Sequence, residues 1–338
     1  MTHPKKAIVL VNTGTPDQPT TGAVRRYLFQ FLNDKRIIDI PWLLRKMLVN
    51  LIIVPFRAPR SAKKYQQLWT DEGSPLLIHL KNLTAKLQKT LPKNYRVYGT
   101  MRYGNPSLKK TLKTLRSQNK EEIIIVPLYP QYATSTTESV ADVVNQIFKG
   151  TDEEPRIHFV RQFYNHPAFI NAFTERIRSY KPETYDHIVF SYHGLPLRQI
   201  DKMHPGIKNH ACPCTEELPV HGQYCYKATC YQTTRLLAAR LALKPNDYTT
   251  VFQSRLTKNW LRPFTDEKLI ALAKRGKKRI LIVAPAFVAD CLETIMELSV
   301  EYTALFKKHG GEKLTLVESL NSKDHWVQAL AEMIKEKS

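Results

Sequence analysis

The sequence predicts an α/β protein in which helices cover parallel sheets, and two observations support this prediction. Apolar runs of strand length alternate with helical patterns along most of the 338 residues, which is the order that parallel sheets require. A polar, turn-rich segment, KGTDEEPRIHFVRQFYNHP (149–167), separates two such halves. We therefore expect α/β domains at 1–160 and 161–320, followed by a terminal helix within 321–338 that packs back on the first domain.

The individual elements follow from the pattern of apolar residues. The expected strands are short apolar runs that end in turn residues or polar groups, and they span 6–14, 95–104, 121–132, 187–196, 248–256, 279–287 and 313–320. The expected helices place apolar residues on one face, and they include 76–91, 169–180, 265–276 and 324–338. No strict sequence repeat relates the two halves.

The charge of the chain limits the classes of partner. Its formal net charge is +21, with 43% hydrophobic and 24% charged residues, which are values of a globular protein. The basic residues are scattered through the expected helices, and no zinc-finger, basic-zipper or RNA-binding motif occurs. We expect an anionic small molecule or an anionic membrane surface as partner, and no nucleic acid.

The most apolar segment is IPWLLRKMLVNLIIVPF (40–56), which Arg45, Lys46 and Asn50 interrupt. It is too short and too polar to span a membrane. Two interpretations remain: a core helix, or an amphipathic lip that rests on a membrane or covers an apolar ligand. The first residues read as a strand and not as a signal peptide, so we expect a cytoplasmic protein with an option of membrane association.

Function has to be read from the ends of the strands, because neither G-x-G-x-x-G nor G-x-x-x-x-G-K-[ST] occurs. His193 in FSYHGLP (190–196) follows an apolar run and is held by a turn. The segment VPLYPQYATSTTESV (126–140) ends a strand in tyrosines and hydroxyl residues. Such polar groups are costly to bury unless they have a partner or a ligand.

A third strand end leads into a row of acids. Asp290, Glu293, Glu297 and Glu301 follow the strand 279–287 at spacings that place them on one face of a helix. A solvated helix face is the ordinary interpretation of such a row. Its position at the carboxyl end of a strand, where open α/β sheets bind ligands, favours a functional one.

Seven motifs together resemble the ferrochelatase family in content and order. They are LVNTGTP (10–16), GSPL (73–76), MRYGNP (101–106), PLYPQYATSTT (127–137), FSYHGLP (190–196), FQSRLTKNWL (252–261) and PAFVADCLETIMEL (285–298). The resemblance implies two similar Rossmann-like domains of the chelatase type, with a porphyrin cleft between them. It also implies an enzyme, a metal–nitrogen lyase, that inserts Fe²⁺ into protoporphyrin IX and so forms protohaem in the last step of haem biosynthesis.

The resemblance assigns roles to several of these residues. It implies that His193 ligates the incoming Fe²⁺ or takes up a pyrrole proton, and that Glu293 lies opposite and completes the catalytic iron site. Glu297 and Glu301 continue the row outward and are candidates for passing hydrated Fe²⁺ or protons. Asp290 is a weaker candidate for that path, since a carboxylate at the start of a helix caps free N–H groups.

The resemblance also implies a porphyrin pocket and a membrane contact. The pocket residues are expected to be Thr13, Ser74, Arg102, Tyr103, Tyr129, Ser135, Thr136 and Trp260. Arg57, Arg60 and Ser74 are further candidates for binding the propionates. The segment 40–56 matches the hydrophobic lip of the family, which favours peripheral membrane contact. The chain departs from some relatives at Cys291, where mitochondrial-type enzymes have histidine, and at Thr13, where others have Tyr or Met.

Four cysteines lie close together in HACPCTEELPVHGQYCYKATC (210–230). Four thiolates fit either tetrahedral Zn²⁺ or a [2Fe–2S] cluster, and the spacing alone leaves both open. Some bacterial ferrochelatases hold a [2Fe–2S] cluster in an internal segment, so the resemblance favours a cluster on Cys212, Cys214, Cys225 and Cys230. His210 and His221 are candidate substitutes for one thiol.

Other functions remain open on the same scaffold. The substrate could be coproporphyrin III, or the reaction could be cobalt insertion into a corrin precursor. A non-catalytic porphyrin-binding or haem-binding protein is the alternative from another class. The presence of both His193 and Glu293 favours an enzyme.

Overall fold

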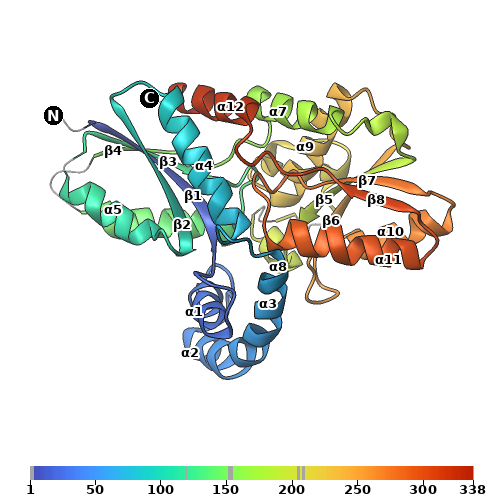
Figure 1. Ribbon diagram of the computed structural model, residues 1–338, viewed down its shortest axis with the longest axis horizontal. Helices are drawn as coiled ribbons and strands as arrows, with labels where there is room; N and C mark the ends of the chain where they lie inside the picture. Colours follow the sequence, from blue (N-terminus) through green and yellow to red (C-terminus); the bar gives the residue numbers. More distant parts are fainter. Residues whose placement is uncertain (1–3, 119, 151–154, 204–205, 208–209, 338) are drawn as a thin grey trace. The chain divides into compact units, whose positions relative to one another are not determined.

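The computed structural model describes residues 4–118, 120–150, 155–203, 206–207 and 210–337, and Figure 1 traces them along the chain. The chain forms two compact units. Unit 1 comprises Met1–Tyr129, Thr134–Gln162 and Ser322–Ser338, and unit 2 comprises Pro130–Ala133 and Phe163–Asn321. The expected boundary segment 149–167 contains residues 151–154, which lie outside the described residues.

The sheet of unit 1 has four parallel strands in the order β2-β1-β3-β4. These strands are β1 (Lys6–Thr15), β2 (Tyr95–Gly104), β3 (Glu122–Pro127) and β4 (Arg156–Phe159). Lys6 of β1 lies opposite Tyr95 on one side and Glu122 on the other. The central strands β1 and β3 are almost fully buried, as the apolar runs predict.

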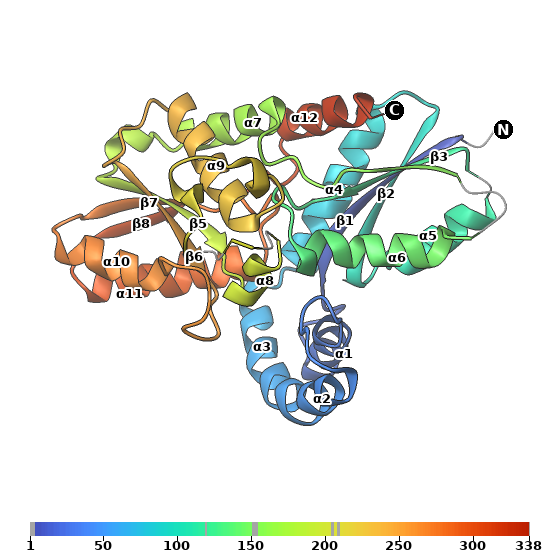
Figure 2. The same cartoon turned by 180° about the vertical axis from the view of Figure 1, so that it is seen from behind.

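Helices flank this sheet. The helices of unit 1 are α1 (Thr21–Leu32), α2 (Trp42–Met47), the π-helix η1 (Leu48–Ile53), α3 (Val54–Leu68), α4 (Pro75–Thr90), α5 (Leu108–Ser117), the π-helix η2 (Thr134–Glu138), α6 (Ser139–Phe148) and α12 (Asp324–Lys335). Helices α5 and α6 pack on one face and lie in front of the sheet in Figure 2. Helix α4 packs on β1 and β2, and α12 packs on α4. An ion pair of 2.6 Å between Lys86 Nζ and Asp324 Oδ1 supports that second contact.

The sheet of unit 2 repeats the same strand order. Its four parallel strands are arranged as β6-β5-β7-β8, and they are β5 (His187–His193), β6 (Tyr248–Gln253), β7 (Arg279–Val283) and β8 (Lys313–Leu316). The helices are α7 (Pro167–Arg178), η3 (Pro182–Thr184), α8 (Leu197–Asp201), η4 (Pro213–Thr215), η5 (Val220–Gly222), α9 (Tyr226–Arg240), α10 (Thr265–Lys274), the π-helix η6 (Glu293–Glu301) and α11 (Tyr302–Lys308).

Strand β5 shows how the two faces of this sheet differ. Tyr192 points to α9, where its hydroxyl lies 2.9 Å from Thr234 Oγ1. Ser191 points to the opposite face, where its hydroxyl lies 3.0 Å from Thr265 Oγ1 of α10. Val189 packs on that face with α10, η6 and α11. Because side chains alternate along a strand, His193 belongs to the face that carries η6.

The prediction of an α/β fold with parallel sheets is confirmed, and its errors concern one edge strand and the ends of strands. The prediction missed β4, since its residues RIHF are half-exposed and read as part of the polar boundary segment. The strand expected at 121–132 ends at Pro127. Prolines at 127 and 130 lack the N–H groups that a longer ladder needs.

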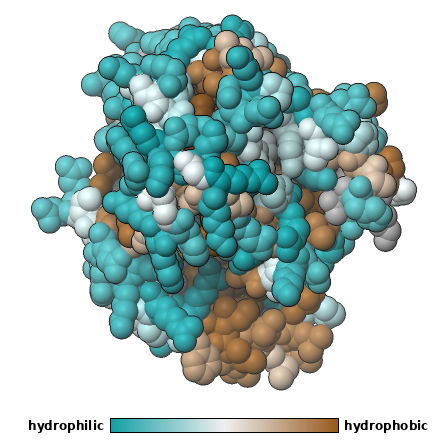
Figure 3. Space-filling model, turned by 90° about the vertical axis from the view of Figure 1, so that its right-hand side faces the viewer, coloured by the Kyte–Doolittle hydropathy of each residue, from teal (hydrophilic) through white to brown (hydrophobic). Residues whose placement is uncertain are grey.

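The segment 40–56 does not form a core helix. It forms α2, η1 and the start of α3, and several of its large apolar side chains are exposed by more than half, including Trp42, Leu51 and Phe56. We call this segment the apolar lip. Figure 3 shows an apolar area on the surface of the protein, and Phe29 of α1 adds a further exposed ring to the lip side chains. In the described parts of the chain, no helix is long and apolar enough to cross a membrane.

His187 at the start of β5 gives a prediction for the pH dependence of stability. Its side chain is buried, and its Nε2 lies 2.8 Å from Thr249 Oγ1. Burial, followed by the charges of Lys268 and Lys277, lowers the pKa of His187 to about 4. Between the ordinary pKa of about 6.5 and this value, the unfolded chain binds a proton that the folded chain does not.

The free energy of unfolding should therefore decrease by up to about 3 kcal/mol as the pH falls through this window. Urea unfolding at pH 7, 5 and 4 measures the effect. The variant His187→Gln should lose this component of the pH dependence and keep the rest. Identical slopes for the two proteins would show that His187 does not cause it.

Candidate functional site

The candidate site in unit 2 begins at the carboxyl end of its central strands. His193 ends β5 and lies opposite Gln253, which ends β6. Gly194 follows, and a Cβ atom at this position would lie 2.8 Å from the carbonyl oxygen of Gln253. Only glycine allows that close approach. The glycine after His193 therefore lets the chain turn directly at the end of β5. This is the edge where α/β sheets bind ligands.

The imidazole of His193 is oriented by its own turn. Its Nδ1 lies 2.7 Å from the carbonyl oxygen of Gly194, and the ring is half-buried. A carbonyl oxygen only accepts, so Nδ1 carries a proton, and in the neutral imidazole Nε2 then carries the lone pair. The hydroxyl of Tyr226 donates a hydrogen bond of 2.8 Å to the carbonyl oxygen of His193. The residue is thus fixed on both its backbone and its ring.

Two aromatic rings flank His193. The ring centroid of Trp260 lies 6.4 Å from that of His193, and the centroid of Phe287 lies 6.5 Å away. Trp260 is held by an antiparallel bridge to Pro196, just beyond the histidine turn. Aromatic walls beside an imidazole nitrogen suit a flat apolar ligand that reacts at a polar centre. The sequence indicated Trp260 and gave no signal for Phe287.

The row of acids lies largely on a π-helix. Helix η6 contains Glu293, Glu297 and Glu301, the first two half-buried and the last exposed. A π-helix bonds residue i to residue i+5 and so holds slightly more residues per turn than an α-helix. Spacings of four therefore keep the three carboxylates on one face. Such helices occur frequently at functional sites.

Glu297 is held by three donors. The backbone N–H of Ser254 donates to its Oε1 at 2.9 Å, the hydroxyl of Ser254 donates to its Oε2, and the hydroxyl of Tyr302 donates to Oε1 at 2.9 Å. Ser254 directly follows Gln253, the strand partner of His193. Burial, together with the Glu297 carboxylate, raises the pKa of Tyr302 well above its usual range, so the phenol stays a donor.

The sequence missed these partners of Glu297. Ser254 adopts a left-handed backbone conformation with φ of 61°, which is uncommon for a residue other than glycine and clusters at functional sites. The motif FQSR contains the serine, yet nothing in the letters shows its conformation. The structure does not test a role of Glu297 in passing Fe²⁺ or protons, so that role stays a prediction.

The expectation that Asp290 caps the helix is wrong. Asp290 is buried, its Oδ2 accepts 2.7 Å from Asn321 Nδ2, and its Oδ1 accepts 3.2 Å from the backbone N–H of Ser319. Its own N–H donates to Asn321 Oδ1 at 2.8 Å. The free N–H of Cys291 at the start of the helix is instead bonded by Thr294, whose Oγ1 accepts from it at 2.9 Å. Asp290 therefore ties the approach to η6 to the segment that follows β8, a contact over 31 residues that spacing cannot reveal.

Cys291 is a buried, protonated thiol beside Glu293. Burial, and next the Glu293 carboxylate, raises the pKa of Cys291 well above its usual value. The structure supports the interpretation of a packed helical cysteine over that of a thiolate ligand.

Several predicted pocket residues lie at the strand ends of unit 1. The hydroxyl of Thr13 in β1 donates to Tyr129 Oη at 3.2 Å, and burial raises the pKa of Tyr129 to about 12. Ser74 is buried, and its Oγ accepts 2.8 Å from the hydroxyl of Thr15. The hydroxyl of Ser74 is thus bonded inside unit 1, whereas Arg57 and Arg60 on α3 are exposed. The propionate assignments stay predictions.

The hydroxyl-rich segment after β3 is also a π-helix. Helix η2 contains Ser135, which is buried, and Thr136, which is half-buried. It follows the third strand of its unit, as η6 follows the third strand of unit 2. The two units therefore place a π-helix at equivalent points of their sheets, although one is rich in hydroxyl groups and the other in carboxylates.

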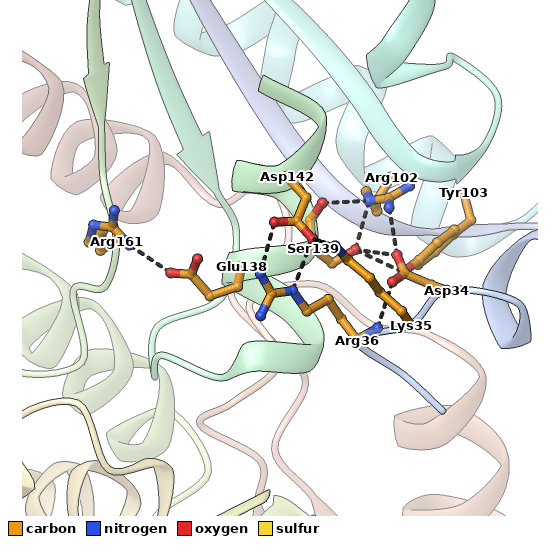
Figure 4. A network of polar contacts seen from close by, with 9 residues as sticks. All are labelled: Asp34, Lys35, Arg36, Arg102, Tyr103, Glu138, Ser139, Asp142 and Arg161. Carbon is orange, nitrogen blue, oxygen red and sulfur yellow. Dashed lines mark hydrogen bonds and ion pairs between the residues drawn. The ribbon is translucent and has the colours of Figure 1, made fainter. Parts of the chain in front are cut away.

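The remaining pocket candidates of unit 1, Arg102 and Tyr103, belong to a network of polar contacts around Asp34 (Figure 4). Their side chains come from the end of β2 and bond to the loop that leads to the apolar lip. The predicted site residues are thus divided between the two units, with His193, Trp260 and the acids in unit 2. A porphyrin cleft between the domains stays a prediction.

The four cysteines of the segment 210–230 are all buried and none forms a disulfide. Burial raises the pKa of Cys214 to about 12, with Lys227 opposing and Cys212 adding to the shift. Cys225 and Cys214 in turn contribute to the raised pKa of Cys230, after burial. The four thiols therefore have little access to water.

The surroundings of these cysteines were partly predicted. Cys212 Sγ lies 3.4 Å from His221 Nε2, whereas His210 is exposed. The guanidinium of Arg235 donates to the carbonyl oxygens of Cys214 and Thr215. Within the described residues, no group of three or more His, Cys, Asp or Glu has the geometry to hold a metal ion. A metal or a cluster on these cysteines therefore stays a prediction.

Comparison with known proteins agrees with this geometry. The family model named Ferrochelatase matches residues 5–338. A ferrochelatase of Coxiella burnetii (strain Dugway 5J108-111) is 40% identical over 341 residues, which cover 98% of this chain and 93% of that protein. A ferrochelatase of Legionella pneumophila (strain Lens) is 40% identical over 337 residues, which cover 98% and 99%.

Among solved structures, SirB from Bacillus subtilis with Fe³⁺ has a similar fold, with a TM-score of 0.54 at 13% identity over 98% of this chain and 95% of that one. At this identity the likeness concerns the fold alone. The family match and the two relatives, which span nearly the whole chain, confirm the resemblance that the seven motifs indicate. On this evidence the chain belongs to the ferrochelatase family.

Proposed function

We propose that this protein inserts Fe²⁺ into protoporphyrin IX and so forms protohaem in the last step of haem biosynthesis. Membership of the ferrochelatase family makes it a metal-inserting enzyme. The observation that supports a catalytic site most directly is His193, whose Nδ1 donates to the carbonyl oxygen of Gly194 and whose ring lies near Trp260 and Phe287.

The reaction sets three requirements. Two pyrrole N–H protons must leave, Fe²⁺ must lose its water ligands, and the flat ring must bend so that its nitrogen lone pairs point at the metal. His193 Nε2 supplies either a proton acceptor or a nitrogen ligand for Fe²⁺. Glu293 supplies a carboxylate on the π-helix that packs on the same face of the sheet.

The identity of the porphyrin is tested by comparing rates. Purified protein is incubated anaerobically with Fe²⁺ and either protoporphyrin IX or coproporphyrin III, and the loss of free-porphyrin fluorescence is followed. We expect a higher kcat/KM for protoporphyrin IX. A higher value for coproporphyrin III would favour that substrate instead. Binding of both porphyrins without turnover by Fe²⁺ or Zn²⁺ would favour a binding protein.

We further propose that Cys212, Cys214, Cys225 and Cys230 hold a [2Fe–2S] cluster. The support is that all four thiols are buried, unoxidised and close together in the sequence. Such a cluster is a redox-active group that also staples the segment around it. Basic groups nearby, Lys227 and Arg235, would offset the negative charge of four thiolates.

The cluster proposal has a direct spectroscopic test. Protein purified without oxygen should absorb visible light and contain about two iron and two sulfide per chain. Cys230→Ser should remove the absorption, whereas Cys291→Ser, which changes a buried cysteine outside the segment, should keep it. A colourless protein that contains zinc would support the alternative and exclude the cluster.

The apolar lip supports a further proposal, namely peripheral association of a cytoplasmic protein with an anionic membrane. Exposed apolar side chains at this density mark an interaction surface. The acids between residues 21 and 70 are Asp34 and Asp39. Exposed basic residues surround the lip, and they are Arg25, Arg26, Lys35, Arg57, Arg60, Lys63 and Lys64. This charge favours anionic lipid headgroups.

Vesicle co-sedimentation tests the membrane proposal. We expect binding to vesicles with phosphatidylglycerol and weak binding to neutral vesicles. Leu51→Ser with Ile52→Ser should lower the affinity by about tenfold or more, because burial of each side chain contributes about 1.5–3 kcal/mol. Val220→Ser changes an exposed apolar residue in unit 2 and should leave binding unchanged. If the unaltered protein and both variants bind anionic vesicles with equal affinity, the lip is not the membrane-binding surface.

A further inference from the structure

The loop between α1 and α2 is fixed by two groups of charged contacts. This loop, residues 33–41, carries the polypeptide from the body of unit 1 into the apolar lip. Its contacts join it to the end of β2 and to the start of α6 (Figure 4). We call this set of residues the lip anchor, and it consists of Asp34, Arg36, Arg102, Tyr103, Ser139 and Asp142.

Asp34 is the centre of the first group. Its side chain is only 7% exposed. One carboxylate oxygen, Oδ2, accepts 2.5 Å from Arg102 Nη2, 2.8 Å from the Tyr103 hydroxyl and 2.7 Å from the Ser139 hydroxyl. The other oxygen accepts 2.8 Å from the backbone N–H of Arg36. A buried carboxylate with four donors from three segments has a single stable position.

The donors around Asp34 are themselves fixed. Arg102 Nε donates to the carbonyl oxygen of Ser139 at 3.0 Å and to its hydroxyl oxygen at 2.8 Å. The Tyr103 ring packs edge-on against Phe31 with a centroid distance of 5.2 Å. Burial, together with the Asp34 carboxylate, raises the pKa of Tyr103 well above its usual range. The phenol therefore stays protonated and donates to Asp34.

The second group is the ion pair of Arg36 with Asp142 of α6, which also has Lys35 Nζ at 3.5 Å. Two guanidinium nitrogens of Arg36 donate to the carboxylate of Asp142, Nε to Oδ2 and Nη2 to Oδ1, each at 2.9 Å. The hydrogen bonds from Arg36 lower the pKa of Asp142. Bidentate geometry fixes direction as well as distance. The loop is therefore held at two points, one at the end of β2 and one on α6.

Arg45 joins the fixed loop to the first helix of the lip. It lies on α2 and is buried among exposed apolar neighbours. Its Nη1 donates back to the carbonyl oxygens of Ile38 and Ile40 at 3.3 and 3.1 Å. Most of the large apolar side chains of the lip are exposed, so few of them support its orientation by packing. Directional polar bonds supply what packing does not.

We propose that the lip anchor sets the orientation of the apolar lip for porphyrin binding, and that Asp34 and Arg36 are positioning residues for the substrate. Arg102 and Tyr103 act in this scheme through Asp34. The proposal rests on the proposed function, because the substrate of the lip is taken to be the porphyrin. The anchor is a feature of unit 1 alone and does not depend on how the units are arranged.

A charge swap tests the proposal. Arg36→Asp and Asp142→Arg each place like charges together and should free the loop, whereas the double variant restores an ion pair of opposite direction. We expect each single variant to raise KM for protoporphyrin IX by about tenfold, while kcat changes by less than about twofold. The double variant should recover part of the loss, because the exposed Lys35 beside position 142 opposes the new arginine. A role in stability alone would lower the active fraction and leave KM unchanged.

Limited trypsin digestion measures how accessible the lip is to cleavage, and it does not depend on enzyme activity. Cleavage after Lys46 and Arg57 should be several times faster in the single variants and close to normal in the double variant. Arg161→Ala is the control, since it removes an ion pair of unit 1 with Glu138 that does not touch the loop. Normal cleavage and normal KM in both single variants, or a double variant as impaired as the singles, would overturn the proposal.

The two readouts also separate this proposal from the proposed function. If the unaltered protein inserts no metal, the proposed function fails, and cleavage together with porphyrin binding by fluorescence still tests the anchor. If Arg36→Asp fails to fold, Tyr103→Phe takes its place. That variant removes one donor to Asp34, and faster cleavage of the lip should follow. Unchanged cleavage in Tyr103→Phe would overturn the role assigned to Asp34.

Discussion

Replacing His193 with alanine is expected to lower kcat for metal insertion by about a thousandfold or more, while porphyrin still binds. General base catalysis contributes about 10²–10⁴-fold, and loss of a metal ligand has a comparable cost. The imidazole lies at the end of β5, and among the described residues its one hydrogen bond is that to the carbonyl oxygen of Gly194, so its loss disturbs little of the fold there. The variant should therefore fold normally.

The measurement is single-turnover insertion of Fe²⁺ into protoporphyrin IX, with porphyrin affinity taken from fluorescence titration. His309→Ala is a matched control, because it removes a half-buried histidine at the end of α11 in the same unit. It should insert metal at the normal rate. If His193→Ala inserts metal as fast as that control, the assignment of the catalytic site is wrong.

The dependence of this rate on pH separates the two roles that remain for His193. A base that takes a pyrrole proton gives a kcat that falls at low pH. A ligand for Fe²⁺ gives a KM for the metal that rises at low pH, since protons and metal compete for Nε2. Comparing kcat with KM for Fe²⁺ over pH 5–8 therefore assigns the role.

The sequence predicted the sheets because their signal is local. A buried parallel strand is a short apolar run, and the segments KAIVLVN in β1 and RILIVAP at β7 have this pattern. Strand β4 was missed because an edge strand needs few apolar residues. The apolar lip was ambiguous for a different reason. Its apolar residues recur as in a core helix, and the sequence does not show that many of their side chains are exposed.

The contacts of the site were harder to predict because they join distant segments. His193 and the acids could be recognised from their position after a strand. The bonds that hold them could not, since Ser254 reaches Glu297 over 43 residues and Asn321 reaches Asp290 over 31. The Asp34 contacts with Arg102 span 68 residues. Spacing along a helix or strand carries no information about such pairs.

Replacing Glu293 with glutamine is the second change with a large expected effect. The amide has the size of the carboxylate but neither its charge nor its affinity for Fe²⁺ and protons. We expect kcat for insertion to fall by about a hundredfold or more, with little change in porphyrin affinity. Glu312→Gln, at an exposed acid of unit 2, is the control and should keep full activity.

The structure gives a reason to single out Glu293 within the acid row. Glu297 already accepts bonds from Ser254 and Tyr302, so both of its oxygens are engaged by the protein. Glu293 has the protonated thiol of Cys291 as a neighbour, a weak donor that a metal or proton can displace. Glu297→Gln should therefore lower the free energy of unfolding, by about 1–3 kcal/mol, more than Glu293→Gln does. The opposite order, with Glu297→Gln costing activity alone, would move the catalytic carboxylate one turn along the π-helix.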